Sequence, residues 1–459
     1  MAKTVKNPPR ILIAATQSGS GKTTITCGIL ALLKKRGLKV QGYKTGPDYI
    51  DPTYLSIAAG QQVHNLDTWL LDKETMTSLF AKHASKSDIT VVEGVMGLYD
   101  GGKNGISSTA EISKLLKIPV ILVIDVKAMG ESAAAIALGF KEYDKNVNLA
   151  GVILNKVGSE KHKEMICEAL EKLNIKVYGV IHRNPEMAIT ERHLGLLPAQ
   201  ENDNKKQIEI ICNSVEKSID IEGLIALSKT TQSIEAEEHK TTNEKKIKLA
   251  VAKDEAFSFY YAESQAELEN AGAEITYFSP LHDKKLPQAD GIIFGGGFPE
   301  MFAKQLSENI EMKNEIINAT NKNIPIIAEC GGFMYLTKSI ANFDGETFQM
   351  CGIIPAISFM TNKLKRMGYV KAESLNDNLL TTKGKVMNGH EFHFSAITPD
   401  NEKTFPYAYE FTGNCGVGEK YKGGYAKDNI IASYLHIHFA GNKEAVKRFI
   451  EKCEKNKTK

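Results

Sequence analysis

Short runs of hydrophobic residues alternate with segments of helical period along the first half of the chain. The expected strands are Ile11–Ala15, Val40–Tyr43, Ile89–Glu93, Val120–Asp125, Ala150–Asn155 and Lys176–Ile181. A helical pattern over Thr23–Arg36 stops before Gly37, a residue typical of helix C-termini. Regular alternation of strands and helices predicts an α/β fold built on a doubly wound, mostly parallel sheet.

A polar stretch at residues 228–246, SKTTQSIEAEEHKTTNEKK, has no period that would bury one face. We expect a first domain at residues 1–228, a linker at 229–246 and a second domain at 247–459; a solvated surface helix is the alternative for the stretch. The alternation then resumes, with a helix expected at Ala262–Asn270 and strands at Ile247–Ala252, Glu274–Phe278, Gly291–Phe294 and Ile324–Ala328. Two α/β domains in tandem are therefore predicted.

Composition and charge exclude several classes of protein. The 459 residues are 42% hydrophobic and 24% charged, enough for two ordinary cores. Because 57 Lys+Arg balance 55 Asp+Glu, no global field attracts nucleic acid. No apolar run approaches the roughly 20 residues of a membrane span, and the seven cysteines form no CxxC pair. We therefore expect a cytoplasmic protein with reduced thiols and no membrane or nucleic-acid partner.

The segment ATQSGSGKTT, residues 15–24, lies between the first strand and the first helix. In such a turn the backbone N–H groups surround phosphates, the lysine neutralises them, and the next hydroxyl binds Mg²⁺. Thr16 stands where the usual first glycine would be. We expect ATP to be bound by Gly19, Gly21, Lys22, Thr23 and Thr24, with Thr23 also a ligand of Mg²⁺.

Two acidic segments follow strands whose carboxyl ends should meet at the same sheet edge. KTGPDYIDP, residues 44–52, follows the second strand, and VVEGVMGLYDG, residues 91–101, places Glu93 at the end of the next. We expect Asp48 and Glu93 to bind Mg²⁺ together with Thr23. Turn and cap chemistry is the alternative for Asp48 and Asp51, whereas a buried Glu93 without a cation would be costly.

Together these segments resemble the dethiobiotin-synthetase-like ATPases, which activate a substrate carboxylate as an acyl phosphate. The loop of that family has one extra residue before its Gly-Lys pair, which accounts for Thr16. The resemblance also implies that Asn155, in GVILNKV at residues 151–157, contacts adenine. An asparagine that caps a strand end is the alternative.

A second set of motifs indicates nucleophilic chemistry in the second domain. IPIIAECGGFMYL, residues 324–336, places Cys330 on a strand-to-helix turn with small neighbours. FGGGFPE, residues 294–300, offers backbone N–H groups for an oxyanion. ASYLHIHF, residues 432–439, reads as a strand with His436 and His438 on the same face, and His436 is the candidate base for Cys330. A purely structural histidine pair is the alternative.

This set resembles class I glutamine amidotransferase domains, in which a cysteine forms a thioester with glutamine and ammonia is released. The common pattern there ends His-x-Glu, whereas this chain has His436-Ile437-His438. The departure resembles the subgroup of cobalamin-pathway amidotransferases that works with a Cys–His dyad. The resemblance implies that Cys330 and His436 are catalytic, and what orients His436 stays open.

The whole chain resembles the cobyrinic acid a,c-diamide synthases in five segments: TGPDYIDP, VEGVMGLYDG, ERHLGLLPA (191–199), MGYV (367–370) and GHEFHFS (389–395). The resemblance implies a carbon–nitrogen ligase that uses ATP and Mg²⁺ to phosphorylate corrinoid acetates, c and then a, before ammonia from glutamine displaces the phosphate. It implies contact between the tetrapyrrole or its acyl phosphate and Tyr49, Asp51 and Asp100. A ring with many carboxylates also suits five basic side chains, otherwise surface or packing residues: Arg192, His193, Arg366, His390 and His393.

Several alternatives stay open at this point. The partners implied are L-glutamine, ATP and cobyrinic acid or a related tetrapyrrole; nickel-sirohydrochlorin or hydrogenobyrinic acid could take the place of cobyrinic acid. Cobyric acid synthase is a more distant relative. A ParA-like ATPase switch is an alternative of another class, disfavoured by the near-neutral charge and by Cys330 with His436. The sequence does not define the oligomeric state, and a homodimer is one of the alternatives.

Overall fold

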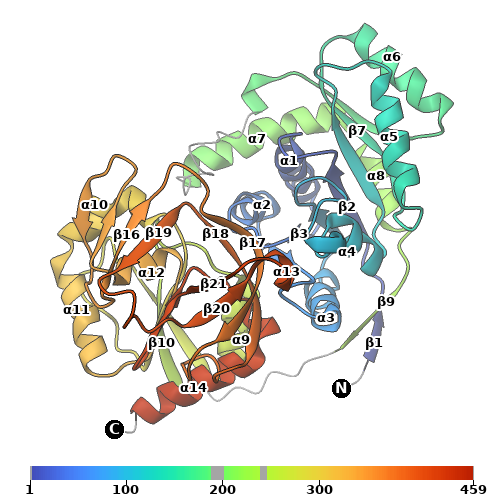
Figure 1. Ribbon diagram of the computed structural model, residues 1–459. Coiled ribbons are helices and arrows are strands. Elements are labelled where there is room, and N and C mark those ends of the chain that lie inside the picture. Colours follow the sequence, from blue (N-terminus) through green and yellow to red (C-terminus); the bar gives the residue numbers. More distant parts are fainter. Residues whose placement is uncertain (1–2, 188–200, 238–245, 458–459) are drawn as a thin grey trace. The chain divides into compact units, whose positions relative to one another are not determined.

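The computed structural model describes residues 3–187, 201–237 and 246–457. The chain divides into two compact units, residues 1–239 and 240–459 (Figure 1). Each unit is an α/β structure with a largely parallel central sheet, as the alternation of strands and helices predicted. No helix within the described ranges combines the length and the apolarity needed to cross a membrane.

A parallel sheet forms the centre of the first unit. Counted over the described residues it has seven strands in the order β4-β3-β5-β2-β6-β7-β8. The strands of this unit are β1 (Lys3–Lys6), β2 (Arg10–Ala15), β3 (Val40–Thr45), β4 (His64–Leu66), β5 (Ile89–Glu93), β6 (Val120–Asp125), β7 (Leu149–Val157), β8 (Val177–His182) and β9 (Ile234–Glu237). All six expected strands are confirmed, as β2, β3, β5, β6, β7 and β8, because strands buried on both faces read as continuous apolar runs.

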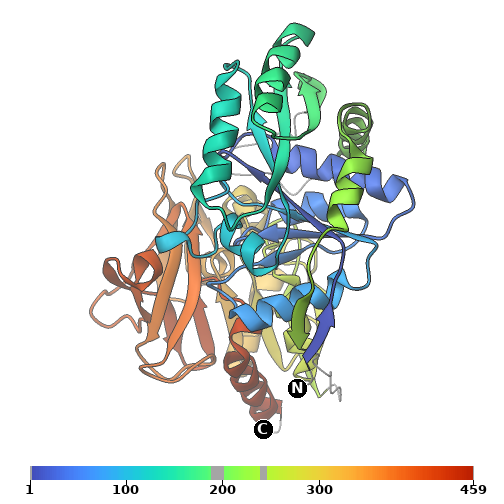
Figure 2. The same cartoon turned by 90° about the vertical axis from the view of Figure 1, so that its right-hand side faces the viewer.

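Helices cover both faces of this sheet. They are α1 (Lys22–Lys35), α2 (Asp51–Ala59), α3 (Lys73–Ala84), α4 (Thr109–Leu115), α5 (Ser132–Tyr143), α6 (Glu160–Lys172), α7 (Glu201–Ser218) and α8 (Ile221–Ser228), with 3₁₀ turns at Lys103–Gly105 and Pro185–Met187. Helices α1, α2, α7 and α8 share one hydrophobic core with the strands. Helices α5 and α6 lie on the opposite side of β7 from α1 and α7 (Figures 1 and 2).

The segment expected to be a linker is structured in its first half. Strand β9 pairs antiparallel with β1, from Lys3↔Glu237 to Lys6↔Ile234, and the two strands lie side by side in Figure 2. Ile234 and Ala236 are buried there, so alternating apolar residues hold this stretch to the first unit. The linker prediction is therefore wrong for residues 234–237, and residues 238–245 lie outside the described residues.

The second unit contains one large and two small sheets. Over the described residues their orders are β11-β10-β12-β13-β23-β22, β15-β14-β16-β19 and β18-β17-β20-β21. The strands are β10 (Ile247–Ala252), β11 (Ala273–Phe278), β12 (Gly291–Phe294), β13 (Ile326–Glu329), β14 (Ser339–Ala341), β15 (Thr347–Gln349), β16 (Ala356–Met360), β17 (Arg366–Ser374), β18 (Val386–His393), β19 (Ser395–Pro399), β20 (Tyr409–Thr412), β21 (Lys420–Gly423), β22 (Tyr425–Lys427) and β23 (Ile430–Ser433). The helices are α9 (Ala262–Asn270), α10 (Ala303–Glu308), α11 (Ile310–Asn321), α12 (Gly331–Leu336), α13 (Gly413–Gly416) and α14 (Lys443–Lys457), with 3₁₀ turns at Pro299–Phe302 and Phe439–Gly441.

The four strands expected after residue 246 are confirmed in the large sheet as β10, β11, β12 and β13. The expected helix is confirmed as α9. The strand expected through ASYLHIHF is wrong from Tyr434 onward, because β23 ends at Ser433. His436 makes an isolated antiparallel bridge to His390, and His438 precedes a 3₁₀ turn. The MGYV and GHEFHFS segments, by contrast, are neighbours, since Tyr369 on β17 pairs with His390 on β18.

Candidate active sites

The turn between β2 and α1 has the backbone of a phosphate-binding loop. Gly19 and Gly21 have φ angles of 76° and 90°, which other residues adopt rarely. A Cβ on Gly21 would lie 2.4 Å from Nδ2 of Asn155. That Nδ2 donates a hydrogen bond to the carbonyl oxygen of Ser20 at 2.9 Å. Asn155 therefore contacts the loop itself. Glycine is required at position 21 for two reasons, the positive φ and the lack of space for a Cβ beside Asn155.

Lys22 begins helix α1 and is buried. Its Nζ donates to the carbonyl oxygen of Met96 at 2.8 Å, and Met96 has a positive φ of 47°. Burial lowers the pKa of Lys22, and the charge of Lys44 lowers it further. A lysine held in this way at the start of a helix is placed to meet the negative charge of a phosphate.

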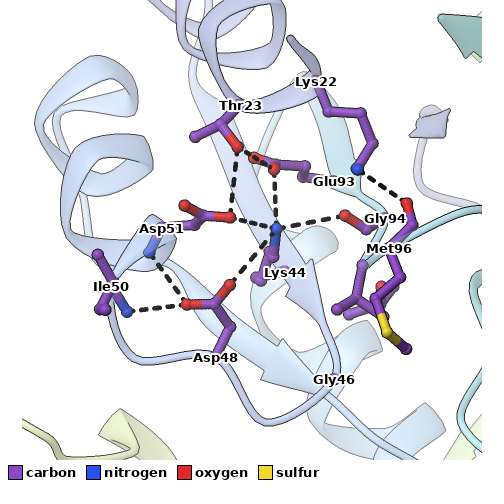
Figure 3. A network of polar contacts seen from close by, with 12 residues as sticks. Lys22, Thr23, Lys44, Gly46, Asp48, Ile50, Asp51, Glu93, Gly94 and Met96 are labelled. Atoms are coloured by element: carbon purple, nitrogen blue, oxygen red, sulfur yellow. Dashed lines mark hydrogen bonds and ion pairs between the residues drawn. The ribbon is translucent and has the colours of Figure 1, made fainter. Parts of the chain in front are cut away.

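Lys44 lies at the centre of the acidic cluster (Figure 3). Strands β3 and β5 pair in a register that places Lys44 opposite Glu93. Lys44 Nζ lies 2.5 Å from Asp51 Oδ2, 2.8 Å from Glu93 Oε1 and 3.6 Å from Asp48 Oδ2. The Thr23 hydroxyl donates to Glu93 Oε1 at 2.7 Å and lies 3.3 Å from Asp51 Oδ2. Three carboxylates thus surround one buried ammonium group, and the P-loop threonine is bonded to two of them.

Burial and mutual charge set the protonation of this cluster. Burial raises the pKa of Asp48 to about 7, and the charge of Asp51 adds to the rise. Burial also raises the pKa of Glu93. At Asp51 burial acts in the same direction, but the charge of Lys44 and the hydrogen bonds from Lys44 and Asp48 together outweigh it and lower the pKa. Burial alone would lower the pKa of Lys44, but the carboxylates outweigh it and hold that pKa well above its usual range. The cluster therefore attracts further positive charge.

The residues expected to bind Mg²⁺ come together here and fit that ion. Glu93 is fully buried, and its Oε2 has no hydrogen-bond partner among the described residues. Hydroxyl and carboxylate oxygens from Thr23, Asp48 and Glu93 are the ligands that Mg²⁺ prefers. Asp51, expected on the substrate side of the phosphates, also lies in this cluster through Lys44 and Thr23.

The other expected ligands of the first unit lie around these elements. Thr24 is in the first turn of α1, and Tyr49 is half-buried before α2. Asp100 is exposed, and its Oδ2 accepts a hydrogen bond from the Gly97 N–H at 3.0 Å. Residues Arg192 and His193, with the rest of ERHLGLLPA, lie outside the described residues.

Cys330 occupies a strained turn between β13 and α12 in the second unit. Its φ of 47° and ψ of −100° are a backbone conformation that costs about 1–3 kcal/mol. The Cys330 N–H donates to the carbonyl oxygen of Ser433 at 2.7 Å. A Cβ on Gly331 would lie 2.9 Å from Pro299 Cδ, and one on Gly332 would lie 2.5 Å from Phe294 Cβ. The small neighbours predicted for a nucleophile turn are therefore required by packing.

The three-glycine segment lies against this turn. A Cβ on Gly331 would come within 3.1 Å of the backbone nitrogen of Gly297, while a Cβ on Gly297 would lie 2.0 Å from the carbonyl oxygen of Ala256. The Gly295 N–H donates to the Tyr260 hydroxyl at 2.8 Å. With Gly295 engaged in this way, Gly296 and Gly297 are the candidate donors to an oxyanion.

His436 is 2% exposed and is held in place from two directions. Its backbone exchanges hydrogen bonds of 2.9 and 3.0 Å with His390, and the two rings stack at 4.9 Å. Its Nδ1 lies 3.4 Å from Glu329 Oε2. Burial acts to lower the pKa of His436, but the neighbouring Cys330 and Glu329 side chains outweigh it and raise the pKa to about 10. Burial, with the charge of His436, holds the pKa of His390 well below its usual range.

His438, whose role the sequence left open, caps the following turn. Its Nδ1 accepts from the Ala440 N–H at 3.2 Å, and its ring stacks on Tyr261 at 4.8 Å. The other basic candidates also make specific contacts: His393 Nδ1 lies 2.7 Å from the carbonyl oxygen of Ser395, and the Arg366 guanidinium lies 3.9 Å from the centre of the Tyr421 ring.

Sequence reasoning missed two charged side chains, Lys44 and Glu329. Each stands next to residues that the motifs singled out, since Lys44 begins KTGPDYIDP and Glu329 precedes Cys330. A charged residue at or near the end of a buried strand was the available signal, because such a residue needs a partner of opposite charge. The identity of that partner depends on which strands are neighbours.

Both units match known domain families. Residues 11–197 match the CobQ/CobB/MinD/ParA nucleotide binding domain, and residues 248–444 match the CobB/CobQ-like glutamine amidotransferase domain. Fold and site together define an enzyme that joins a P-loop nucleotide-binding domain to a glutamine amidotransferase domain.

Three relatives that match nearly the whole chain are named cobyrinate a,c-diamide synthase. Those of Caldanaerobacter subterraneus subsp. tengcongensis and Dehalococcoides mccartyi (strain ATCC BAA-2266 / KCTC 15142 / 195) are each 44% identical, covering 96% and 97% of this chain and 98% of each relative. That of Picrophilus torridus is 42% identical over 96% of this chain and 98% of its own. The chain belongs to the cobyrinate a,c-diamide synthase family.

Proposed function

We propose that this enzyme amidates the a and c acetate carboxylates of cobyrinic acid, using ATP and glutamine, through acyl phosphate intermediates. One observation carries the proposal: the same chain holds a P-loop lysine beside an acidic cluster and a cysteine on a strained turn next to a buried histidine. The first is suited to phosphorylating a carboxylate and the second to releasing ammonia from glutamine. The names of the relatives support the choice of substrate.

The first unit would activate the carboxylate. In the proposed binding mode, ATP phosphates lie on the N–H groups from Gly19 to Thr24, with Lys22 Nζ moving from Met96 to the γ-phosphate. A substrate carboxylate oxygen attacks the γ-phosphorus, ADP leaves, and an acyl phosphate forms. Tyr49, Asp51 and Asp100 are proposed to contact the tetrapyrrole or the acyl phosphate, and Asn155 the adenine.

Thr23, Asp48 and Glu93 would hold Mg²⁺, which when bound neutralises charge on the transferring phosphoryl group. Lys44 already compensates part of the carboxylate charge. With an ion present, its ammonium group would be released from Glu93 and become available to the acyl phosphate. Lys44 is thus proposed to keep the cluster stable before the ligands bind.

The second unit would release ammonia. Cys330 gives its proton to His436, and the thiolate attacks the side-chain amide carbon of glutamine. His436 then protonates the leaving ammonia as the C–N bond breaks, and a water activated by the same imidazole hydrolyses the thioester to glutamate. Gly296 and Gly297 are proposed to donate to the oxyanion. The ammonia attacks the acyl phosphate, and phosphate leaves.

The experiment that tests the proposal counts amides. The enzyme is incubated with ATP, Mg²⁺, glutamine and, in separate reactions, cobyrinic acid, hydrogenobyrinic acid or nickel-sirohydrochlorin, and the products are analysed by mass spectrometry. Two amides on cobyrinic acid, formed with equal amounts of glutamate, ADP and phosphate, support the proposal. If another ring were diamidated in preference to cobyrinic acid, the proposed reaction would stand and the assigned substrate would be wrong. Nucleotide hydrolysis without any amide would refute the reaction itself.

A further inference from the structure

We propose that Glu329 is a positioning residue that orients His436 toward Cys330. It would take the part that the final carboxylate plays in amidotransferases whose sequence ends His-x-Glu, a position that His438 occupies here. This inference rests on the proposed glutaminase function of the second unit. It concerns a residue that precedes the nucleophile in the chain and that no motif assigned to the reaction.

The fold brings Glu329 to His436 through strand pairing. Glu329 is the last residue of β13, and β13 pairs with β23 so that Glu329 is opposite Ser433. The chain leaving β23 reaches His436 three residues later, where its backbone bonds with His390 fix it. Glu329 Oε2 then lies 3.4 Å from His436 Nδ1, with side-chain exposures of 17% and 2%. A carboxylate this little exposed is weakly screened and acts strongly on its neighbour.

The other groups near His436 do not replace this carboxylate. His390, on β18, has a depressed pKa and is neutral at physiological pH; its Nε2 lies 2.9 Å from the Tyr261 hydroxyl. His438 is engaged with the Ala440 N–H. Cys330 and Glu329 both act on the His436 ring, and Glu329 is the carboxylate that lies 3.4 Å from its Nδ1.

A carboxylate at Nδ1 has two consequences for the reaction. Its negative charge, 3.4 Å from Nδ1, favours a proton on that nitrogen although the two atoms form no hydrogen bond here, and this leaves the other ring nitrogen to exchange a proton with Cys330. It also stabilises the imidazolium that forms, and the raised pKa of His436 agrees with this. Glu329 touches neither glutamine nor the reacting sulfur in this scheme.

The test compares Glu329→Gln with wild type in glutamate release, at saturating and limiting glutamine. We expect kcat to fall between about tenfold and the roughly 10⁴-fold known for a buried triad carboxylate, with an unchanged KM. The alkaline limb of the pH profile should move to lower pH, because the imidazolium loses its stabilising charge. Glu329→Asp keeps the charge at a longer distance and should give an intermediate kcat.

Glu274→Gln is the matched control, since it makes the same change at an exposed position on β11 of the same sheet, and should behave as wild type. A wild-type kcat for Glu329→Gln, or a raised KM with an unchanged kcat, would overturn the inference. Cys330→Ala, measured in parallel, separates a failure of the proposed glutaminase function from a failure of the proposed role of Glu329. If Cys330→Ala still hydrolyses glutamine, the proposed function fails; if it does not while Glu329→Gln matches wild type, only the role of Glu329 fails.

Discussion

Replacing Lys44 with methionine should destabilise the first unit strongly. The substitution keeps most of the apolar volume and removes the ammonium group from beside Asp48, Asp51 and Glu93, at 3.6, 2.5 and 2.8 Å. The Lys44 side chain is only 3% exposed, so water cannot take its place freely. Three carboxylates would then face one another without a resident cation.

The size of the effect follows from this geometry. At an effective dielectric of about 20, one unit charge pair at 2.8 Å is worth about 6 kcal/mol before desolvation is subtracted. Removing one partner of a buried ion pair costs about 3–5 kcal/mol in practice. In a unit of residues 1–239, each kcal/mol corresponds to about 2–4 °C in Tm, so a loss of about 6–20 °C is expected.

Differential scanning calorimetry, which follows each unit's transition, measures this loss, with Lys39→Met as an exposed control just before β3. Magnesium with ATP should raise the Tm of Lys44→Met more than that of wild type, because the ion replaces the missing charge. A Tm within about 2 °C of the control at pH 8 would refute the argument, since the three carboxylates would then not depend on Lys44.

Three further predictions concern the same unit. Lys22→Ala and Glu93→Gln should each lower amidation by about 10²-fold or more with either glutamine or ammonium as nitrogen source, because both act on the phosphates; substantial ammonium-dependent activity would show that the phosphate site is misassigned. Asp100→Ala should reduce product formation while the ATP affinity measured by calorimetry stays unchanged, and a loss of ATP affinity would place Asp100 on the nucleotide. Without Mg²⁺, wild type should lose stability relative to Asp48→Asn as the pH rises from about 4 to 7, because the folded state keeps a proton on Asp48, pKa about 7, that the unfolded chain releases. Urea unfolding across that range measures the difference, and a constant difference would contradict the raised pKa.

The sequence predicted the large sheets because their strands are buried on both faces. Strands such as β5, β6 and β12 read as continuous apolar runs, and their bounds agree with those expected. The two smaller sheets in residues 339–423 were not predicted. Their strands are short or half-exposed, as in β17, where buried and exposed residues mix. Such strands are defined by distant pairing partners rather than by a local pattern.

The same distinction separates the site residues that were predicted from those that were missed. The local sequence alone predicts the turns that hold Cys330, Lys22 and Thr23, because small residues there stand between a strand and a helix. The partners of Lys44 and Glu329 follow from the strand order, which places β3 beside β5 and β13 beside β23. His438 looked like a strand neighbour of His436 because the residues alternate, but β23 ends before either. Local spacing could not show where the strand stops.

The yield of diamide from Cys330→Ala, with glutamine or with ammonium as nitrogen source, tests the central claim most directly. The variant lacks the thiol needed for the glutamyl thioester, whereas Lys22, Thr23 and the acidic cluster belong to the other unit. The account predicts no diamide from cobyrinic acid with glutamine, and wild-type amounts with high ammonium at mildly alkaline pH, where free ammonia is abundant. Efficient use of glutamine by Cys330→Ala, or equal failure with ammonium, would contradict it.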